Sequence, residues 1–197
     1  MSFAMLLSMG AFALAASISP GPVNLVCLSS GTRYPVAQGL IFVTGATLGF
    51  VLLFLAIGLG LYSAMQLVAG LDNLLRWLGA VFLLYLSLQL MRDNGRLSDD
   101  RKLSAPGFFT GALMQWLNPK AWLASASGIA AYTNGQDIWQ VAVFAGLYLP
   151  ICWLSLSCWV YAGAYLQRHV HRPLTMIIIN RTLALLLALS TLYLLFG

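Results

Sequence analysis

The hexapeptide Ser19-Pro20-Gly21-Pro22-Val23-Asn24 interrupts an apolar run, residues 1–32, that contains no charged side chain. A run of this length is sufficient for a helix that crosses a bilayer. Pro20 and Pro22 have no N–H to donate and their rings clash with the preceding turn, so a helix must kink or open here. The backbone groups that are freed cannot face lipid and are tolerated only when buried in protein or beside a wet cavity.

Two interpretations of this hexapeptide are open. One is a simple proline kink in a membrane helix. The other is a functional break, because secondary transporters bind substrates at discontinuous helices near the middle of the membrane. Two prolines, a glycine and the polar Asn24 together favour the functional break. A signal peptide is disfavoured because residues 1–18 contain no Lys or Arg, so we expect a retained first helix.

The composition is that of an integral membrane protein. Of the 197 residues, 60% are hydrophobic and 8% are charged, and the mean hydropathy is +0.86. Soluble domains carry about 25% charged residues. The net charge of +5 indicates basic cytoplasmic loops rather than nucleic-acid binding. Cys27, Cys152 and Cys158 lie in apolar segments without a C-x-x-C pair, which predicts small buried side chains rather than disulfides or metal ligands.

Six apolar segments, each long enough to cross a hydrocarbon core of about 30 Å, predict an all-α polytopic membrane protein. We expect them at residues 3–29, 37–62, 73–91, 107–131, 138–165 and 175–196. The polar stretch Arg92–Ala105 is interpreted as a solvated linker. The chain is then one integral membrane domain, 1–197, with halves of about 1–91 and 107–197 and a cytoplasmic linker of about 92–106.

The distribution of basic residues predicts the orientation of these segments. The first, third and fifth loops contain Lys or Arg, whereas the second and fourth contain none. Short basic loops stay in the cytoplasm, so we expect both termini outside. The basic loop residues are Arg33, Arg92, Arg96, Arg101, Lys102, Arg168 and Arg172. Three helices before the linker and three after it would give two halves of opposite orientation.

The fourth segment contains its own proline motif, Gln115-Trp116-Leu117-Asn118-Pro119-Lys120-Ala121. Pro119 occupies a position in the second half that corresponds to that of Pro20 in the first. Interrupted hydrophobic segments at corresponding positions of two inverted halves indicate a transporter binding site.

Three sets of residues carry a resemblance to a known family. The first is Ser19–Asn24 followed by Gly31, Gly39, Gly45 and Gly49; the second is Arg76-Trp77-Leu78-Gly79-Ala80 with Tyr85; the third is Gly107-Phe108-Phe109-Thr110-Gly111 with Leu117-Asn118-Pro119-Lys120-Ala121. In this order they resemble the LysE/RhtB family of amino-acid exporters, over residues 10–125. In that family Pro-Gly-Pro is followed directly by Asn, whereas Val23 here displaces the asparagine to Asn24. The resemblance implies export of amino acids or close derivatives from the bacterial cytoplasm across the inner membrane, driven by proton antiport.

The residues themselves suggest how a zwitterion could bind. Half-helices that begin after Pro22 and Pro119 would offer N–H groups and a partial positive charge to a carboxylate. Lys120 adds a full positive charge; its alternative role is a side chain that snorkels to the interface. The predicted substrate-binding residues are Ser19, Pro20, Gly21, Pro22, Asn24, Gln115, Asn118, Pro119 and Lys120.

No Asp or Glu lies within the six segments, so the substrate's ammonium needs other partners. We expect carbonyl groups around Ser19 and Asn118, the side-chain oxygens of Asn24 or Gln115, or the faces of Trp116 and Trp122. The missing carboxylate favours a neutral amino acid over a dicationic one.

The remaining motifs have simpler expected roles. Gly45-x-x-x-Gly49 allows close helix packing. Arg181 is expected to snorkel, and His169 and His171 to be solvated rather than to bind a metal. No cofactor is expected. An enzyme is disfavoured because no nucleophile stands with a base. A structural or assembly subunit, and an exporter of another solute or metal ion, are the alternatives; homo-oligomerisation stays open.

Overall fold

The structure, a computed structural model, describes residues 1–60, 71–92, 105–133, 137–169 and 173–196. These residues are mainly helical, as predicted, and none of them forms a strand. The helices are α1 (Phe3–Ile18), α2 (Pro22–Arg33), α3 (Val36–Gly58), α5 (Leu71–Met91), α6 (Phe108–Trp116), α7 (Pro119–Tyr132), α8 (Ile138–His169) and α9 (Pro173–Phe196).

Two of the expected segments consist of two helices each. The first is divided into α1 and α2, whose axes differ by 60°. The fourth is divided into α6 and α7, with Leu117 and Asn118 between them. Pro22 and Pro119 are the first residues of the second helix in each pair. Proline suits this position because its fixed φ fits the helix and its missing N–H would have no partner there.

Length and hydropathy identify the helices that can cross a membrane. Among the described residues, α3 and α8 each pass this test alone, and α1 with α2 is a third span if the bent pair counts as one. Pro150 lies inside α8 without ending that helix. A proline inside an apolar segment therefore does not always end a helix in this chain. At Pro22 and Pro119, in contrast, one helix has ended and the next begins.

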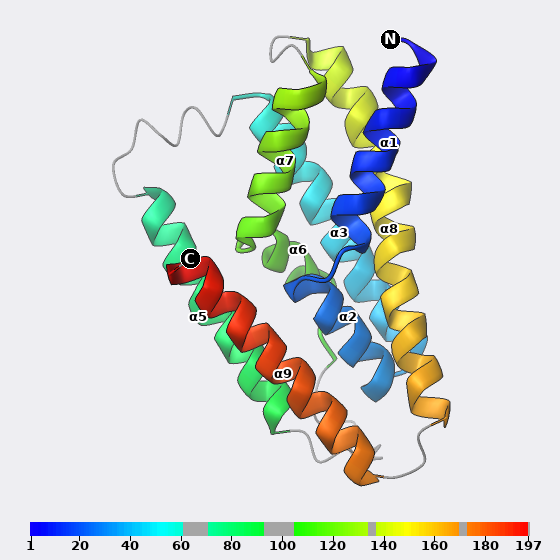
Figure 1. The fold of residues 1–197 in the computed structure, drawn as a ribbon, viewed down its shortest axis with the longest axis vertical. Helices are drawn as coiled ribbons and strands as arrows, with labels where there is room; N and C mark the ends of the chain where they lie inside the picture. Colours follow the sequence, from blue (N-terminus) through cyan, green and yellow to red (C-terminus); the bar gives the residue numbers. More distant parts are fainter. Residues whose placement is uncertain (61–70, 93–104, 134–136, 170–172, 197) are drawn as a thin grey trace.

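The helices run back and forth along one direction (Figure 1). From the N-terminus, α1 and α2 descend, α3 returns, α5 descends, α7 ascends, α8 descends and α9 ascends. Helix α8 packs against α1, α2 and α3, while α6 and α7 pack against α3. Helices α5 and α9 lie side by side, and α9 also contacts α2. This arrangement brings the α1–α2 break and the α6–α7 break to the same part of the molecule.

Aromatic side chains form the centre of the core between α3 and α8. The ring of Tyr148 lies 4.7 Å from that of Phe50, 5.1 Å from that of Phe54 and 5.2 Å from that of Phe144, centroid to centroid. These distances are typical of favourable aromatic pairs. The four rings fix the position of α8 beside the break in α1.

Glycines allow the closest helix contacts. A methyl group on Gly45 or Gly49 of α3 would overlap backbone atoms of Phe108 or Ala112 in α6. The packing role predicted from the Gly45-x-x-x-Gly49 spacing is therefore confirmed. Gly163 of α8 lies equally close to the backbone of α2 at Leu28.

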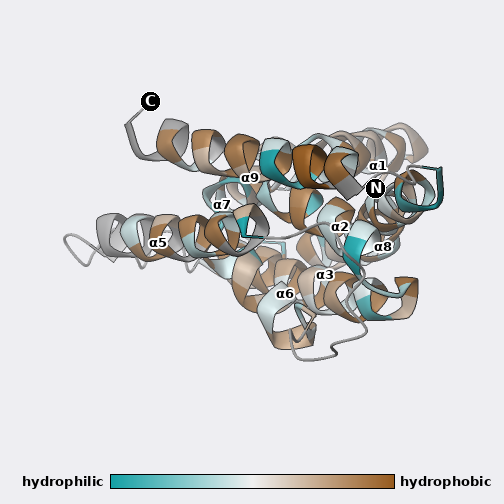
Figure 2. Cartoon of the chain, turned by 90° about the horizontal axis from the view of Figure 1, so that it is seen from below, coloured by the Kyte–Doolittle hydropathy of each residue, from teal (hydrophilic) through white to brown (hydrophobic). Residues whose placement is uncertain are grey.

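The outer surface is apolar. Figure 2 shows hydrophobic residues on the outer sides of α3, α5, α6 and α9. Large apolar side chains that are well exposed include Leu52, Phe109, Leu123, Leu154 and Ile178. An apolar exposed surface of this extent is unusual for a soluble monomer and fits contact with lipid.

Three arginines that follow or end helices lie at one end of the molecule. Helices α2, α5 and α8 all end at the lower end of Figure 1. Arg33 is in the last turn of α2, Arg92 follows α5, and Arg168 is in the last turn of α8. Most of the linker Arg92–Ala105, most of the second loop, Arg172 and His171 lie outside the described residues.

The three cysteines do not share one environment. Cys27 and Cys152 are buried, as predicted, and they are unpaired. The prediction is wrong for Cys158, which is exposed on the surface of α8. A thiol is apolar enough to occupy such a surface, so its place within an apolar segment did not distinguish an inward from an outward position.

Candidate functional site

The two helix breaks are joined by the side chain of Lys120. Its Nζ donates to the carbonyl oxygen of Ser19 at 2.7 Å, to Ser19 Oγ at 2.9 Å and to the carbonyl oxygen of Pro20 at 3.3 Å. Ser19 is the C-cap of α1 and Lys120 lies in the first turn of α7. The ammonium therefore sits at the end of α1 where the helix dipole is negative. In this conformation Lys120 does not snorkel.

The break between α1 and α2 leaves no carbonyl without a donor from residue 17 to residue 21. Lys120 serves Ser19 and Pro20. The donors to Ser17, Ile18 and Gly21 are Asn24 Nδ2 at 2.9 Å, Trp159 Nε1 at 3.1 Å and Leu25 N at 3.0 Å. Buried backbone groups need such partners, so side chains from α2, α7 and α8 stabilise the open conformation.

The two helix N-termini at the breaks differ. At α7, Asn118 Oδ1 accepts a hydrogen bond from Lys120 N at 3.1 Å, so a side chain caps this helix. At α2 the N-cap is Gly21, and no side chain caps the helix. An uncapped first turn presents N–H groups and a partial positive charge. Two helix N-termini were predicted to face an anion. Among the described residues, only that of α2 has no side-chain cap.

Gly21 also leaves room for Lys120. A Cβ atom on Gly21 would lie 3.0 Å from Lys120 Cδ and 3.1 Å from Lys120 Nζ. The φ of Gly21 is −170°, an extended conformation open to any residue, so its backbone does not require glycine. A side chain here would instead crowd the path of Lys120 to Ser19, and the end of the lysine would have to move by a few tenths of an ångström.

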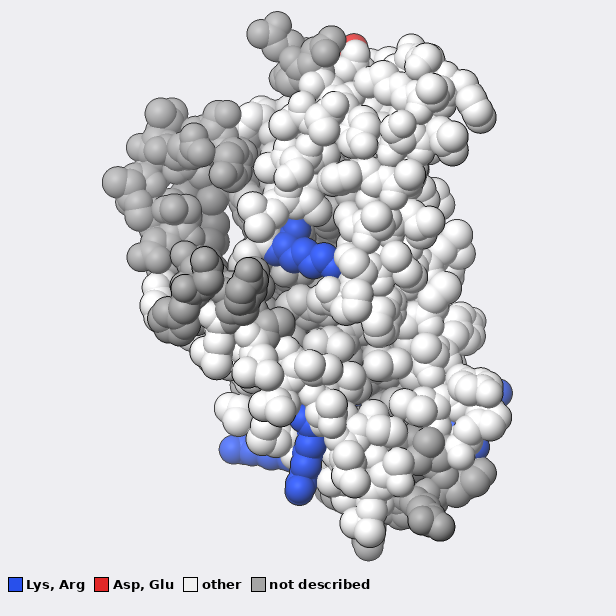
Figure 3. Space-filling model, in the orientation of Figure 1, with Lys and Arg blue, Asp and Glu red and all other residues white. Residues whose placement is uncertain are grey.

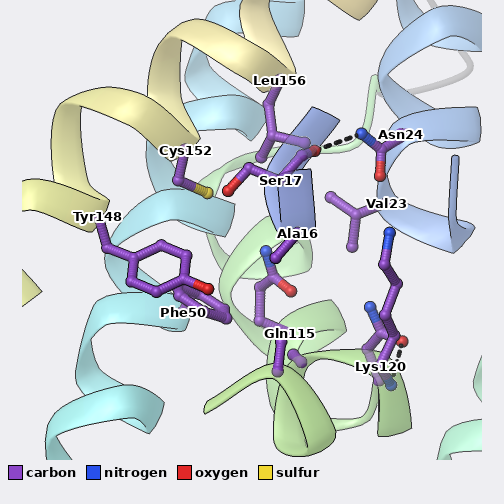
Figure 4. A pocket seen from close by; sticks show the side chains of 13 residues that line it. Ala16, Ser17, Val23, Asn24, Phe50, Gln115, Lys120, Tyr148, Cys152 and Leu156 are labelled. Carbon is purple, nitrogen blue, oxygen red and sulfur yellow. Dashed lines mark hydrogen bonds between the residues drawn. The ribbon is translucent and has the colours of Figure 1, made fainter. Parts of the chain in front are cut away.

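A cavity of about 40 Å³ lies beside the two breaks (Figure 4). It has room for a few water molecules but not for an amino acid. Four of the predicted binding residues line it: Asn24, Gln115, Asn118 and Lys120. The other five predicted residues, Ser19, Pro20, Gly21, Pro22 and Pro119, form the breaks and are not among its lining residues. The rest of the lining comes from Ala16, Ser17, Val23, Phe50, Ala121, Ala124, Tyr148, Cys152 and Leu156.

Helix α8 supplies polar lining that the sequence analysis did not identify. Tyr148 is fully buried and its hydroxyl has no hydrogen-bond partner within the described residues. A buried hydroxyl without a partner costs about 1–3 kcal/mol. Cys152, one turn later, lies with its Sγ 3.9 Å from Thr47 Oγ1. No signal in the sequence separates these residues from core residues, because α8 is apolar on every side from residue 141 to residue 154.

The cavity contains one formal charge. Of its 13 described lining residues, Lys120 alone is a basic residue and none is a carboxylate. Figure 3 shows one basic side chain in a hollow near the middle of this face, with the other visible basic side chains at the lower end. A polar cavity with one ammonium suits a ligand that carries a carboxylate and no further net charge.

The other polar candidates lie apart from this cavity. His169 Nδ1 is 2.8 Å from the carbonyl oxygen of Tyr165, and no group of three metal-binding side chains occurs among the described residues. Arg181 is exposed, while its neighbour Asn180 is buried and accepts a hydrogen bond from Thr32.

Comparison with known proteins gives a family and several relatives. The model of the LysE type translocator matches residues 14–197. The cysteine/O-acetylserine efflux protein of Klebsiella pneumoniae is 25% identical over 160 residues, which cover 80% of this chain and 81% of the relative. The protein of the same name from Salmonella paratyphi A is 26% identical over 174 residues, 85% of this chain and 88% of the relative. No solved structure gives a significant match.

These findings agree with the prediction that the chain is a transporter and not an enzyme. They also cover the region of both helix breaks and all of the cavity lining, since the family match begins before Ala16 and continues to the end of the chain. The family resemblance read from the motifs at Ser19–Asn24 and Leu117–Ala121 is confirmed, and the chain belongs to the LysE type translocator family.

Proposed function

We propose that this protein exports neutral amino acids or close derivatives from the cytoplasm across the bacterial inner membrane. The observation that carries the proposal is the meeting of two interrupted helices at a small polar cavity whose one charge is the Lys120 ammonium. The similarity to cysteine/O-acetylserine efflux proteins supports a small substrate without net charge.

The proposed topology has six membrane-spanning segments in a single domain. They are α1 with α2, α3, α5, α6 with α7, α8 and α9, arranged as two inverted halves of three. The alternating directions of the helices support this arrangement (Figure 1). The position of Arg33, Arg92 and Arg168 at one end supports a cytoplasmic location for that end and an external location for both termini.

The substrate's carboxylate would bind between Lys120 and the N-terminus of α2. Both groups border the same cavity: Lys120 from one side, and Val23 and Asn24 in the first turn of α2 from the other. An ammonium and an uncapped helix N-terminus each favour an anion, and both are stronger where water is scarce. Asn118 would keep its present role, which is to fix the first turn of α7.

The substrate's ammonium would bind to the oxygens of Ser19 and Pro20. In this structure the same three oxygens accept hydrogen bonds from Lys120 Nζ. They therefore form a site of the right polarity and spacing for a primary ammonium. A carboxylate that draws Lys120 toward the cavity would release these oxygens for the ammonium of the same molecule. The amides of Asn24 and Gln115 are further candidates to orient it.

Transport requires this cavity to widen, because about 40 Å³ does not accommodate an amino acid. We propose that the two halves rock about the breaks, as in other transporters with discontinuous helices. Proton antiport is the energy source that we propose.

The test measures transport into inverted membrane vesicles that contain the protein. A panel of neutral, acidic and basic amino acids is compared, with and without a proton gradient. We expect uptake of small neutral amino acids that is stimulated by an acidic vesicle interior. An absence of amino-acid flux would contradict the proposal and would favour a structural or assembly subunit. An amino-acid flux that is equal with and without the proton gradient would reject only proton antiport.

A further inference from the structure

The hydroxyl of Tyr148 is buried and has no hydrogen-bond partner among the described residues, although Tyr148 is one of the residues that line the cavity. Its ring packs against the rings of Phe50, Phe54 and Phe144. Phenylalanine would make the same ring contacts and would not bury an unpaired hydroxyl. The packing of the core therefore does not explain the presence of tyrosine at this position.

The surroundings of this hydroxyl are polar and uncharged. Figure 4 shows Tyr148 and Cys152 on the side of the cavity opposite Lys120 and Asn24, with Ser17 between the two sides. Gln115 contributes an amide from α6 between them. A substrate whose carboxylate is near Lys120 would thus place its side chain toward Tyr148 and Cys152.

We propose that Tyr148 is a specificity-determining residue, whose hydroxyl forms a hydrogen bond with the side chain of the transported amino acid. This inference rests on the proposed function. It names the substrate class as small, uncharged amino acids whose side chain carries a hydroxyl, a thiol or an ester oxygen. A tyrosine hydroxyl can donate to an ester or hydroxyl oxygen and can accept from a hydroxyl or thiol.

The same arrangement disfavours other side chains. An apolar side chain would leave the Tyr148 hydroxyl buried without a partner, and a site that is built for a hydrogen bond discriminates strongly against an analogue that lacks it. A charged side chain would find no opposite charge on this side of the cavity.

The experiment compares substrates that differ in one group. Cysteine and serine are each measured against 2-aminobutyrate, which carries a methyl group in place of the thiol or hydroxyl. Uptake into inverted vesicles is measured as a function of concentration for the wild type, Tyr148→Phe and Ser155→Ala. Ser155 is the matched control because it lies in the same helix and also buries an unpartnered hydroxyl, but it does not line the cavity.

We expect the wild type to prefer cysteine or serine over 2-aminobutyrate by about tenfold or more in kcat/KM, which corresponds to about 1.4 kcal/mol. Tyr148→Phe should remove this preference by lowering kcat/KM for the polar substrates while that for 2-aminobutyrate stays equal or rises. Its thermal stability should not fall, because the variant no longer buries an unpaired hydroxyl. Ser155→Ala should retain the preference.

Three results would overturn the inference. The first is a wild type without preference, which needs no variant and decides the matter even if Tyr148→Phe does not fold. The second is an unchanged preference in Tyr148→Phe, as expected if the hydroxyl binds only water. The third is an equal loss for all substrates, which would indicate a structural role. If the wild type exports no amino acid, the proposed function itself is rejected; flux without the Tyr148 effect rejects the inference alone.

Discussion

Lys120 Nζ lies 2.7 Å from the carbonyl oxygen of Ser19, although the two residues are 101 positions apart in the chain. Ser19 is the C-cap of the first half of one interrupted helix, and Lys120 lies in the first turn of the second half of another. The hydrogen bond therefore connects the two proline motifs directly.

Replacement of Lys120 by methionine should weaken substrate binding about tenfold or more. The variant removes the ammonium that we propose to bind the carboxylate, and hydrogen bonds to charged groups contribute about 1.5–3 kcal/mol each. It also leaves the carbonyls of Ser19 and Pro20 without their donor, so thermal stability in detergent should fall. Substrate affinity from equilibrium binding and the melting temperature are the measurements. The control is Arg181→Met, which removes an exposed cation; unchanged affinity in Lys120→Met would reject the binding role.

Gly21→Ala should lower transport by displacing Lys120. The new Cβ would lie 3.0–3.1 Å from two atoms of that side chain, whereas the extended backbone of residue 21 accepts alanine. We expect a reduction of at least severalfold in kcat/KM. Gly146→Ala is the matched control, because a Cβ there meets no atom within 4 Å.

The same mechanism predicts that Gly21→Ala and Lys120→Met are not additive. Once Lys120 is replaced by methionine, the methyl group added at position 21 no longer displaces an ammonium. The double variant should therefore resemble Lys120→Met alone. A double-mutant cycle on substrate affinity measures this coupling. Purely additive effects would show that Gly21 acts by another route.

Replacement of Pro20 and Pro22 together by alanine should abolish export while the protein still inserts in the membrane. Alanine permits a continuous helix, which would straighten the 60° bend and remove the open carbonyls that bind Lys120. Pro150→Ala, in the continuous helix α8, should keep most of the activity and serves as the control. Export at the normal rate by the double variant would show that the opening motif is only a kink.

Reporter fusions should place Gly197 outside and the stretch 92–105 in the cytoplasm. The reason is the collection of arginines at the ends of α2, α5 and α8. Paired alkaline phosphatase and fluorescent protein fusions at each position give the side of the membrane. A cytoplasmic signal at Gly197 would contradict the six-segment topology.

The helix ends at both motifs could be predicted because their causes are local. Proline lacks a donor and clashes with the preceding turn wherever it occurs, so Pro20, Pro22 and Pro119 identified the positions where helices end or begin. Lys120 was identifiable because a charge within an apolar segment is costly and needs a partner. Its hydrogen-bond partner could not be predicted in the same way, because Ser19 becomes the acceptor only through the packing of α7 beside α1.

The contribution of α8 could not be predicted. Tyr148 and Cys152 lie one turn apart in a part of α8, residues 141–154, that is apolar on every side, so no periodicity marks the side that faces the cavity. That side is set by the contacts of α8 with α1, α2 and α3, which connect residues far apart in the chain. The capping of α7 by Asn118, and the lack of a cap at α2, likewise depended on side-chain geometry.

The bond between Lys120 and Ser19 means that the proposed binding site would hold a tethered competitor for its own ligand. The ammonium of Lys120 already occupies the oxygens to which the substrate's ammonium would bind. Because Lys120 is part of the chain, its effective concentration at these oxygens is set by the backbone and not by the cell. The apparent affinity is then the intrinsic affinity reduced by the fraction of molecules in which Lys120 has moved away. In the proposed mechanism, the lysine would return to these oxygens when the substrate leaves. Such an internal ligand favours release, which is the step that an exporter must complete against a concentration gradient.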